Sequence, residues 1–96
     1  MISRRQHIDA LVGERLRWAR KRRRMTLGDV EAASGGEFRI SVLGAYERGA
    51  RGVAVHRLLR LAEIYGVQPA ELLPDDDQGS DRDHAASQRY PPDSVL

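Results

Sequence analysis

The chain contains no cysteine, and no apolar run in it approaches the length of a membrane span. Without cysteine there can be no disulfide and no cysteine-based zinc site, a composition compatible with the cytosol. A membrane helix needs about 18 or more consecutive apolar residues, and a secretory leader needs a shorter apolar run after a basic start. The opening "MISRRQHIDA" has the charge but not the apolar run. We therefore expect neither a membrane span nor a signal peptide in this sequence.

Groupings of catalytic or metal-binding side chains are also missing. The three histidines, His7, His56 and His84, are scattered and show no metal-ligand spacing. The sequence shows no phosphate-binding glycine loop, no pair of carboxylates and no Ser/His/Asp set. It therefore predicts a protein that is not an enzyme and that uses neither a cofactor nor a metal ion.

Charge is abundant and unevenly distributed. Residues 1–73 contain 14 Lys or Arg against 8 Asp or Glu, whereas residues 74–96 contain 2 against 6. A basic body with an acidic tail points to an anionic partner for the body, although a run of charge can equally be a solvated helix face. The basic run 21–24 has the same two interpretations, contact with a nucleic-acid backbone or simple solvation.

Apolar residues recur at helical spacing along most of the basic body. Thr26 has the character of an N-cap with Asp29 in the following turn, and Gly35, Gly49 and Gly66 mark helix ends. The pattern predicts five helices, at about 8–23, 27–34, 40–48, 55–65 and 69–73. Strand-like alternation and internal repeats are absent from the sequence. The predicted fold class is therefore all-α.

The same pattern predicts which residues face the core. The stripe of the first helix consists of Ile8, Leu11, Val12, Leu16 and Ala19, with Trp18 at its flank. The corresponding residues of the third and fourth helices are Leu43, Tyr46, Val55, Leu58, Leu59, Ala62 and Tyr65. Gly44, inside the third helix, costs up to about 1 kcal/mol relative to alanine. It indicates either a weak helix or a surface that something approaches closely.

Composition divides the chain into three parts. We expect residues 1–7 to be a flexible N-terminus and residues 8–73 to be one helical domain. Residues 74–96, "PDDDQGSDRDHAASQRYPPDSVL", are acidic and polar and contain proline, so we expect them to form a disordered tail.

Three stretches, in this order, resemble the lambda-repressor-like (XRE) helix-turn-helix family. "GERLRWARKRRRMTLGDV" (13–30) resembles its first two helices, with the family's Leu-Arg-x-x-Arg step at Leu16, Arg17 and Arg20. "YERG" (46–49) matches the family's aromatic-Glu-x-Gly signature, and "LLRLAEIYGVQPAELL" (58–73) matches its closing helices. Each stretch alone is weak, but together they are a strong signal.

A closer resemblance is to the DNA-binding domain of BldD-type regulators of actinobacteria. It is carried by "SVLGAYERGARGVAVHRL" (41–58) and by a turn before it that is longer than usual in the wider family. We expect no counterpart here of that family's second domain, which binds a cyclic dinucleotide. Three residues depart from the common pattern. Arg24 stands where glycine is usual after the first helix, and Leu27 and Ile40 replace polar residues at the front of the second and third helices.

The resemblance implies a five-helix DNA-binding domain in a sequence-specific transcriptional regulator, cytoplasmic and nucleoid-associated. It also implies binding to double-stranded DNA as a homodimer on a palindromic site, with the helix at 40–48 reading the major groove. The implied DNA-binding residues are Thr26, Arg39, Ile40, Ser41, Gly44, Ala45, Arg48 and Arg51. Val67, Leu72 and Leu73 are candidates either for the dimer interface or for closing the core.

The chemistry of these side chains suits the implied roles. Arg39 can bind a guanine through two hydrogen bonds or bind a phosphate, and Ser41 can bind either group. Ile40 can contact a thymine methyl. Arg48 and Arg51 follow the third helix, where phosphate contact is expected. Thr26 can present a helix N-terminus to a phosphate, although capping alone would explain it.

The resemblance also implies a largely buried ion pair between Arg20 and Glu47. A fork-shaped guanidinium matches a carboxylate, and such a pair fixes one helix against another more than it adds stability. We expect Glu47 to be structural, because no second titratable group is placed to work with it in catalysis.

Two other functions fit the same features. One is the antitoxin of a toxin–antitoxin pair, which would bind its own operator and contact the toxin through the acidic tail. The other is a protein–protein interaction module that uses the helix-turn-helix surface to contact another protein. A neighbouring toxin reading frame would favour the first, and absence of salt-sensitive DNA binding would favour the second.

Overall fold

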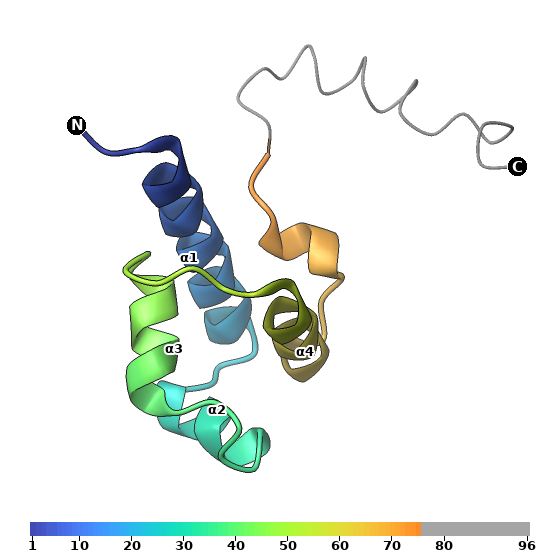
Figure 1. Cartoon of the computed structure of the whole chain (residues 1–96). Helices are drawn as coiled ribbons and strands as arrows, with labels where there is room; N and C mark the ends of the chain where they lie inside the picture. The colour runs from blue at the N-terminus through green and yellow to red at the C-terminus, as the bar shows by residue number, and fades with distance from the viewer. Residues whose placement is uncertain (76–96) are drawn as a thin grey trace, which may run out of the picture.

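The computed structural model describes residues 1–75, which form four α-helices and one short 3-10 helix. In chain order these are α1 (Arg4–Arg22), α2 (Leu27–Ala33), α3 (Ile40–Glu47), α4 (Val55–Tyr65) and η1 (Pro69–Leu72). Figure 1 shows α3 and α4 on either side of α1, with α2 across the lower end. No strand occurs among the described residues, so the all-α prediction is confirmed. Most of the predicted disordered tail, residues 76–96, lies outside the described residues.

The first helix starts at Arg4 rather than at the predicted Ile8, so residues 4–7 of the predicted flexible N-terminus are helical. A capping box explains the earlier start. The Ser3 hydroxyl accepts a hydrogen bond from the Gln6 amide (3.1 Å), and the Gln6 side chain accepts one from the Ser3 amide (2.8 Å). Two amides that would otherwise lack partners are satisfied by this exchange.

The turn from α1 to α2 requires a left-handed residue, and Arg24 adopts it with a φ of 58°. This conformation costs a non-glycine residue roughly 1–2 kcal/mol. A second capping box follows at once: Thr26 Oγ1 accepts from the Asp29 amide (3.0 Å), and Asp29 Oδ2 accepts from the Thr26 amide (2.8 Å). The predicted N-cap at Thr26 is therefore confirmed, and α2 begins at a fixed residue.

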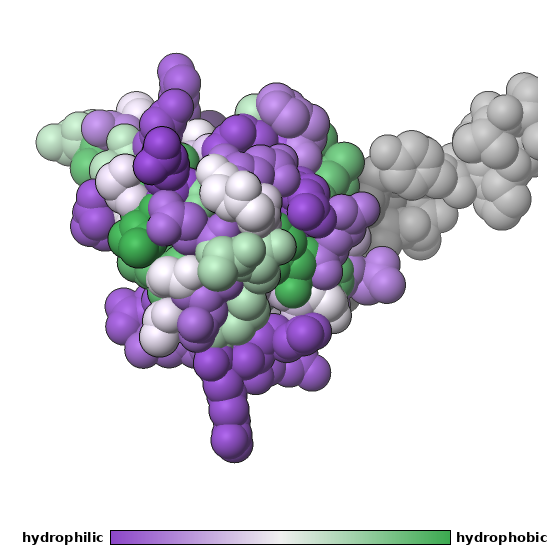
Figure 2. All heavy atoms as spheres, turned by 90° about the horizontal axis from the view of Figure 1, so that it is seen from below, coloured by the Kyte–Doolittle hydropathy of each residue, from purple (hydrophilic) through white to green (hydrophobic). Residues whose placement is uncertain are grey.

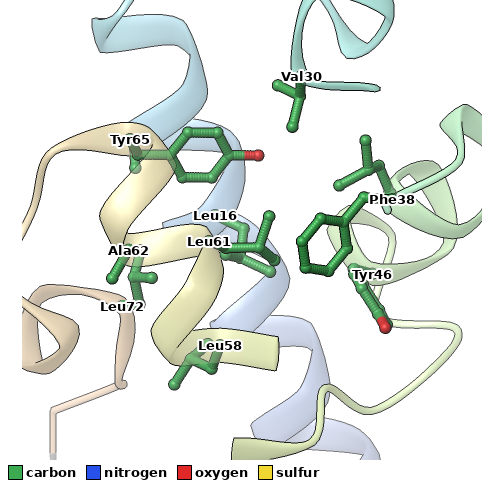
Figure 3. Packing of buried hydrophobic residues seen from close by; sticks show 11 residues of the cluster. Leu16, Val30, Phe38, Tyr46, Leu58, Leu61, Ala62, Tyr65 and Leu72 are labelled. Atoms are coloured by element: carbon green, nitrogen blue, oxygen red, sulfur yellow. The ribbon is translucent and has the colours of Figure 1, made fainter. Parts of the chain in front are cut away.

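The core lies where α1, α3 and α4 meet, closed by Phe38 from the loop before α3 (Figure 3). In this view Leu16 and Leu61 appear between the rings of Tyr65 and Phe38, and all four residues belong to the same buried cluster. The buried apolar residues are Leu16, Ala19, Val30, Phe38, Leu43, Tyr46, Leu58, Leu61, Ala62, Tyr65 and Leu72.

Three predicted core residues are exposed. Ile8 is 37% exposed, Leu59 46% and Val55 72%. Leu61 is fully buried instead. Two overlapping stripes of α4 fit the helical period, and packing against α1 and Phe38 selects the one that contains Leu61. Trp18 is also exposed, at 43%, with the Arg22 guanidinium 5.3 Å from its ring centroid.

The predicted fifth helix is a single 3-10 turn, η1. Pro69 occupies its first turn, and Leu72 is fully buried. Arg15 on α1 donates a hydrogen bond to the Glu71 carbonyl (3.4 Å). Although η1 is short, it closes the core at the end of the domain.

Glycine allows the loop after α3 to approach α1 closely. A Cβ atom on Gly13 would lie 2.7 Å from the Glu47 carbonyl oxygen, and one on Gly49 would lie 2.7 Å from Ala10 Cα. Gly49 also has a positive φ, 73°. Both contacts leave no room for a side chain, so the two glycines set the distance between α1 and α3.

Candidate nucleic-acid interface

An ion pair between Arg20 and Glu47 holds α3 against α1. Arg20 Nε donates to Glu47 Oε2 (2.7 Å) and Arg20 Nη2 donates to Glu47 Oε1 (2.9 Å). The third nitrogen, Nη1, donates to the Met25 carbonyl (2.8 Å). The two side chains are only 11% and 9% exposed. The hydrogen bond to Glu47 raises the pKa of Arg20 above its ordinary value, although burial opposes the shift.

The same arginine therefore joins three segments. It fixes α3 through Glu47 and fixes the turn before α2 through Met25. Because both partners are nearly inaccessible to water, removal of either leaves the other charge uncompensated. The ion pair orients α2 and α3 relative to α1.

The first turn of α2 lies alongside α3. A Cβ atom on Gly28 would be 3.7 Å from Thr26 Oγ1 and 3.9 Å from Ile40 Cδ1. A Cβ atom on Gly44 would be 3.9 Å from Leu27 Cδ1. Thr26 and Ile40, which are far apart in the sequence, therefore face a shared surface at the junction of the two helices.

Arg39, Ile40 and Ser41 form the exposed entrance to α3. Arg39 is the N-cap residue and its side chain makes no capping hydrogen bond. Ile40 is 45% exposed although it is large and apolar. An open groove beside this entrance is lined by Gly28, Glu31, Ala32, Gly35, Gly36 and Arg39.

Glu31 at this entrance is a residue that the sequence reading missed. Its Oε2 accepts a hydrogen bond from the Ile40 amide (3.2 Å). A carboxylate from α2 thereby caps α3, and its negative charge lies at the positive end of the helix dipole. Nine positions separate the two residues, so no local capping pattern could reveal the contact.

Two predicted outward-facing residues of α3 are not fully exposed. Gly44 is buried and Ala45 is half-buried. Gly44 is buried because the side chain of Arg48 covers it. Arg48 Nη1 lies 3.0 Å from the position that a Gly44 Cβ atom would occupy. The sequence placed Gly44 on the correct helix but on an open surface, whereas Arg48 covers it.

Arg48 and Arg51 follow α3 and are both exposed. Arg48 is the C-cap residue of α3. Arg51 lies farther along, beside Ile8, Asp9 and Val12 of α1. Within residues 1–75 the ion pairs involve other arginines, and Arg39, Arg48 and Arg51 have no carboxylate partner.

Arg57 on α4 contacts α3 and the loop before it, and the sequence did not predict this contact. Its Nε donates to the Tyr46 hydroxyl (2.8 Å), and its guanidinium lies 4.5 Å from the Phe38 ring centroid. The arginine thus joins the end of α3 to the loop that precedes it. An arginine above an aromatic ring is a favourable cation–π arrangement, but the spacing of these residues in the sequence gives no sign of it.

Other basic residues of the predicted run 21–24 have structural partners. Arg23 Nη1 donates to the Tyr65 carbonyl at the end of α4 (3.3 Å). Arg22 lies over Trp18 and its Nη1 is 4.0 Å from Glu71 Oε1. For both arginines, these contacts favour a structural role within the protein over contact with the DNA backbone.

Figure 2 shows the molecule from below, where α2 comes to the front. Hydrophilic residues border a central area of apolar ones on this face, and long hydrophilic side chains project from the edge.

Residues 1–75 contain no group of three or more acidic, histidine or cysteine side chains that could hold a metal ion. His84 lies outside the described residues. None of the helices described is long and apolar enough to cross a membrane.

Comparison with family models shows that residues 11–74 match a helix-turn-helix domain. The chain belongs to the helix-turn-helix family. The matched range includes all of α2, α3, α4 and η1 and most of α1. The predicted family is thereby confirmed.

Two solved structures resemble this helix-turn-helix protein. The crystal structure of the DNA-binding domain of BldD is 41% identical, with a TM-score of 0.69, and the match covers 76% of this chain and 100% of that one. The BldD DNA-binding domain from S. venezulae is 43% identical, with a TM-score of 0.68, and the match covers 71% and 99%. Among curated proteins, no sequence matches the chain. The predicted resemblance to BldD is confirmed.

Proposed function

We propose that this helix-turn-helix protein is a sequence-specific DNA-binding transcriptional regulator that places α3 in the major groove. The observation that carries the proposal is the junction of α2 and α3, where exposed Arg39, Ile40 and Ser41 stand at the entrance of α3. The 41% identity to the DNA-binding domain of BldD supports the same function. A regulator of this kind would act in the cytoplasm, associated with the nucleoid.

The residues at the N-terminus of α3 contact the base edges. Arg39 is exposed and has no carboxylate partner among residues 1–75, so we expect its guanidinium to bind guanine O6 and N7. Ser41 is the second residue of α3 and can bind a base or a phosphate, while the exposed Ile40 can contact a thymine methyl. Ala45 adds little, because it is half-buried and has no polar group.

Backbone positioning falls to residues at the edges of α3. Thr26 caps α2 beside Ile40, so its hydroxyl and the first turn of α2 face the same surface. Arg51 extends the basic surface beyond the other end of α3, while Arg48, the C-cap residue, reaches back over Gly44. Phosphate contacts fix register and orientation, whereas contacts with base edges carry the sequence information.

We also propose that the protein binds a palindromic site as a homodimer, with half-sites about one helical turn apart. Of the three residues suggested for the interface, Leu72 is fully buried and Val67 packs against the core. Leu73, at 47% exposure, is the most accessible of the three. Two proteins per duplex at saturation would support the dimer, and one protein on an isolated half-site at saturation would argue against it.

The test of DNA recognition begins with selection of duplexes from a random library by the full chain. We expect an enriched sequence that binds at least about tenfold more tightly than a scrambled duplex. The affinity should fall steeply with salt concentration, as phosphate contacts require. Mapping of bound sites in cells, with transcript levels measured after deletion, then tests regulation. Absence of enrichment together with salt-insensitive binding would support a protein-docking module instead.

A further inference from the structure

Gly44 poses a physical problem in the middle of α3. A glycine within a helix costs about 1 kcal/mol relative to alanine, and Gly44 has neither a positive φ nor a backbone contact that excludes a side chain. In this it differs from Gly13 and Gly49, whose Cβ atoms would collide with main-chain atoms. Its φ and its backbone surroundings would therefore permit alanine.

The atom that a Gly44 side chain would meet belongs to Arg48. A Cβ atom there would be 3.0 Å from Arg48 Nη1 and 4.0 Å from Arg48 Cζ. Since Arg48 is one turn farther along α3, its side chain must fold back along the helix to reach this position. The guanidinium then covers Gly44, which explains why this glycine is buried.

The guanidinium consequently lies at the α2–α3 junction. The same hypothetical Cβ atom would be 3.9 Å from Leu27 Cδ1, in the first turn of α2. Within residues 1–75, Arg48 has no ion-pair or side-chain hydrogen-bond partner. A cation is thus held over the middle of α3, near the first turn of α2, with donors that no residue among 1–75 uses.

We propose that Gly44 is a positioning residue, whose missing side chain seats the Arg48 guanidinium at the α2–α3 junction, where it binds a DNA phosphate. This inference rests on the proposed function. It changes the role of both residues. Arg48 acts over the middle of α3 rather than beyond its end, and Gly44 acts through Arg48 rather than by contact with DNA.

Gly28 provides a matched control. It is also a helical glycine at the α2–α3 junction, but a Cβ atom there would make only ordinary contacts, at 3.7 and 3.9 Å, and would not meet Arg48. Gly28→Ala and Gly44→Ala therefore add the same methyl group to the same surface. Only the second should displace the arginine.

The experiment is a binding titration of full-length Gly44→Ala, Arg48→Ala, the double variant and Gly28→Ala against the selected and the scrambled duplex. Each titration is repeated at several salt concentrations, and each variant is also melted. Arg48→Ala should lose on the order of tenfold in affinity on both duplexes, with a salt slope shallower by about one unit. Gly44→Ala should melt at or above the parent's temperature yet lose affinity on both duplexes. In the Arg48→Ala background, Gly44→Ala should have no further effect.

Four outcomes would overturn the proposal. The first is that Gly44→Ala binds like the parent. The second is that Gly44→Ala weakens binding equally with and without Arg48, which would mean that Gly44 itself approaches the DNA. Gly28→Ala could weaken binding as much as Gly44→Ala, which would indicate general crowding. A loss confined to the selected duplex would make Arg48 a base contact. The unsubstituted protein tests the proposed function separately. If that function is wrong, the unsubstituted protein itself shows no salt-sensitive DNA binding.

Discussion

Single side chains connect the helices of this domain, and Arg20 joins three segments by itself. Its three nitrogens bind Glu47 and the Met25 carbonyl, so one side chain joins α1, α3 and the turn before α2. Buried pairs add little net stability over an apolar replacement, but an unpartnered buried charge is expensive. Arg20 therefore mainly fixes the positions of these segments relative to one another. The protein loses stability when either partner of the ion pair is removed.

Glu47→Ala should lower the melting temperature sharply. The substitution leaves the Arg20 guanidinium buried without its carboxylate, at a cost of about 3–5 kcal/mol in the free energy of unfolding. For a domain of this size that corresponds to a fall of more than about 10 °C. Thermal unfolding followed by circular dichroism measures it. A variant that melts within a few degrees of the parent would contradict the buried pair.

Tyr65 is a second informative residue, because its buried hydroxyl has no hydrogen-bond partner among residues 1–75. Burial, and then the negative charge of Glu47, raise the pKa of Tyr65 above its ordinary value of 10.0, while Arg20 opposes the shift. The folded protein therefore keeps this phenol neutral at a pH at which the unfolded chain ionises it. The resulting stability is present below pH 10 and is lost as the pH rises above it.

Tyr65→Phe should be at least as stable as the parent at pH 7, because it removes a buried hydroxyl without a partner. It should also lose less stability above pH 10, where the parent loses up to about 1.4 kcal/mol per pH unit from this group. Urea unfolding at pH 7 and between pH 10 and 11 measures both effects. If the variant is clearly less stable at pH 7, the hydroxyl has a partner, such as a buried water.

At the scale of elements, α3 has two chemically different ends. Its N-terminus carries exposed Arg39 and Ile40 and is capped by Glu31 of α2. Its C-terminus leads to Gly49, which packs against Ala10, and on to Arg51 beside α1. The first end faces the junction with α2, whereas the second leads away from it.

Arg39→Ala should cost about 1–3 kcal/mol on the preferred duplex and relax discrimination at one base position. Titration of specific and scrambled duplexes at several salt concentrations distinguishes base reading from phosphate contact. If Arg39→Ala loses equally on both duplexes, Arg39 binds phosphate. Specificity would then come from Ser41, Ile40 or DNA shape.

Arg51→Ala should weaken binding to all duplexes alike and make the salt slope shallower by about one unit. Its position in the loop after α3, away from the entrance, favours the backbone over base edges. The same titrations serve as its measurement. A loss limited to the preferred duplex would assign base reading to this loop.

At the scale of the whole molecule, positive charge lies in the folded domain and negative charge in the tail. Residues 74–96 carry 6 acidic and 2 basic side chains. One tail contact is described, between Arg15 and Asp75 at 3.4 Å, with the two side chains 38% and 72% exposed. Exposed pairs of this kind contribute about 0–1 kcal/mol. The folded domain therefore gains little from this contact with Asp75.

A chain that ends at Pro74 should fold and bind DNA at least as tightly as the full chain. Acidic residues repel phosphate, and the shortened chain keeps every residue of the buried core. Melting curves and duplex titrations of both chains make the comparison. Weaker DNA binding after truncation would show that the tail dimerises the protein, positions the domain or contacts DNA.

The sequence by itself determined most of the elements, because periodicity and caps are local properties. Its short motifs identified the family, and the resemblance to that family implied the ion pair between Arg20 and Glu47. Thr26 with Asp29 predicts the start of α2, and Gly66 predicts the end of α4. Ser3 with Gln6 carries the same capping signal, which would have placed the start of α1 correctly.

Only the tertiary structure decided which side of each element is used. Leu61 rather than Leu59 enters the core because α4 rotates to meet α1 and Phe38. Glu31 caps α3, and Arg48 covers Gly44, through contacts that no short pattern encodes. A helical period fixes positions within one helix, but the rotation of that helix minimises the free energy of the whole packed core.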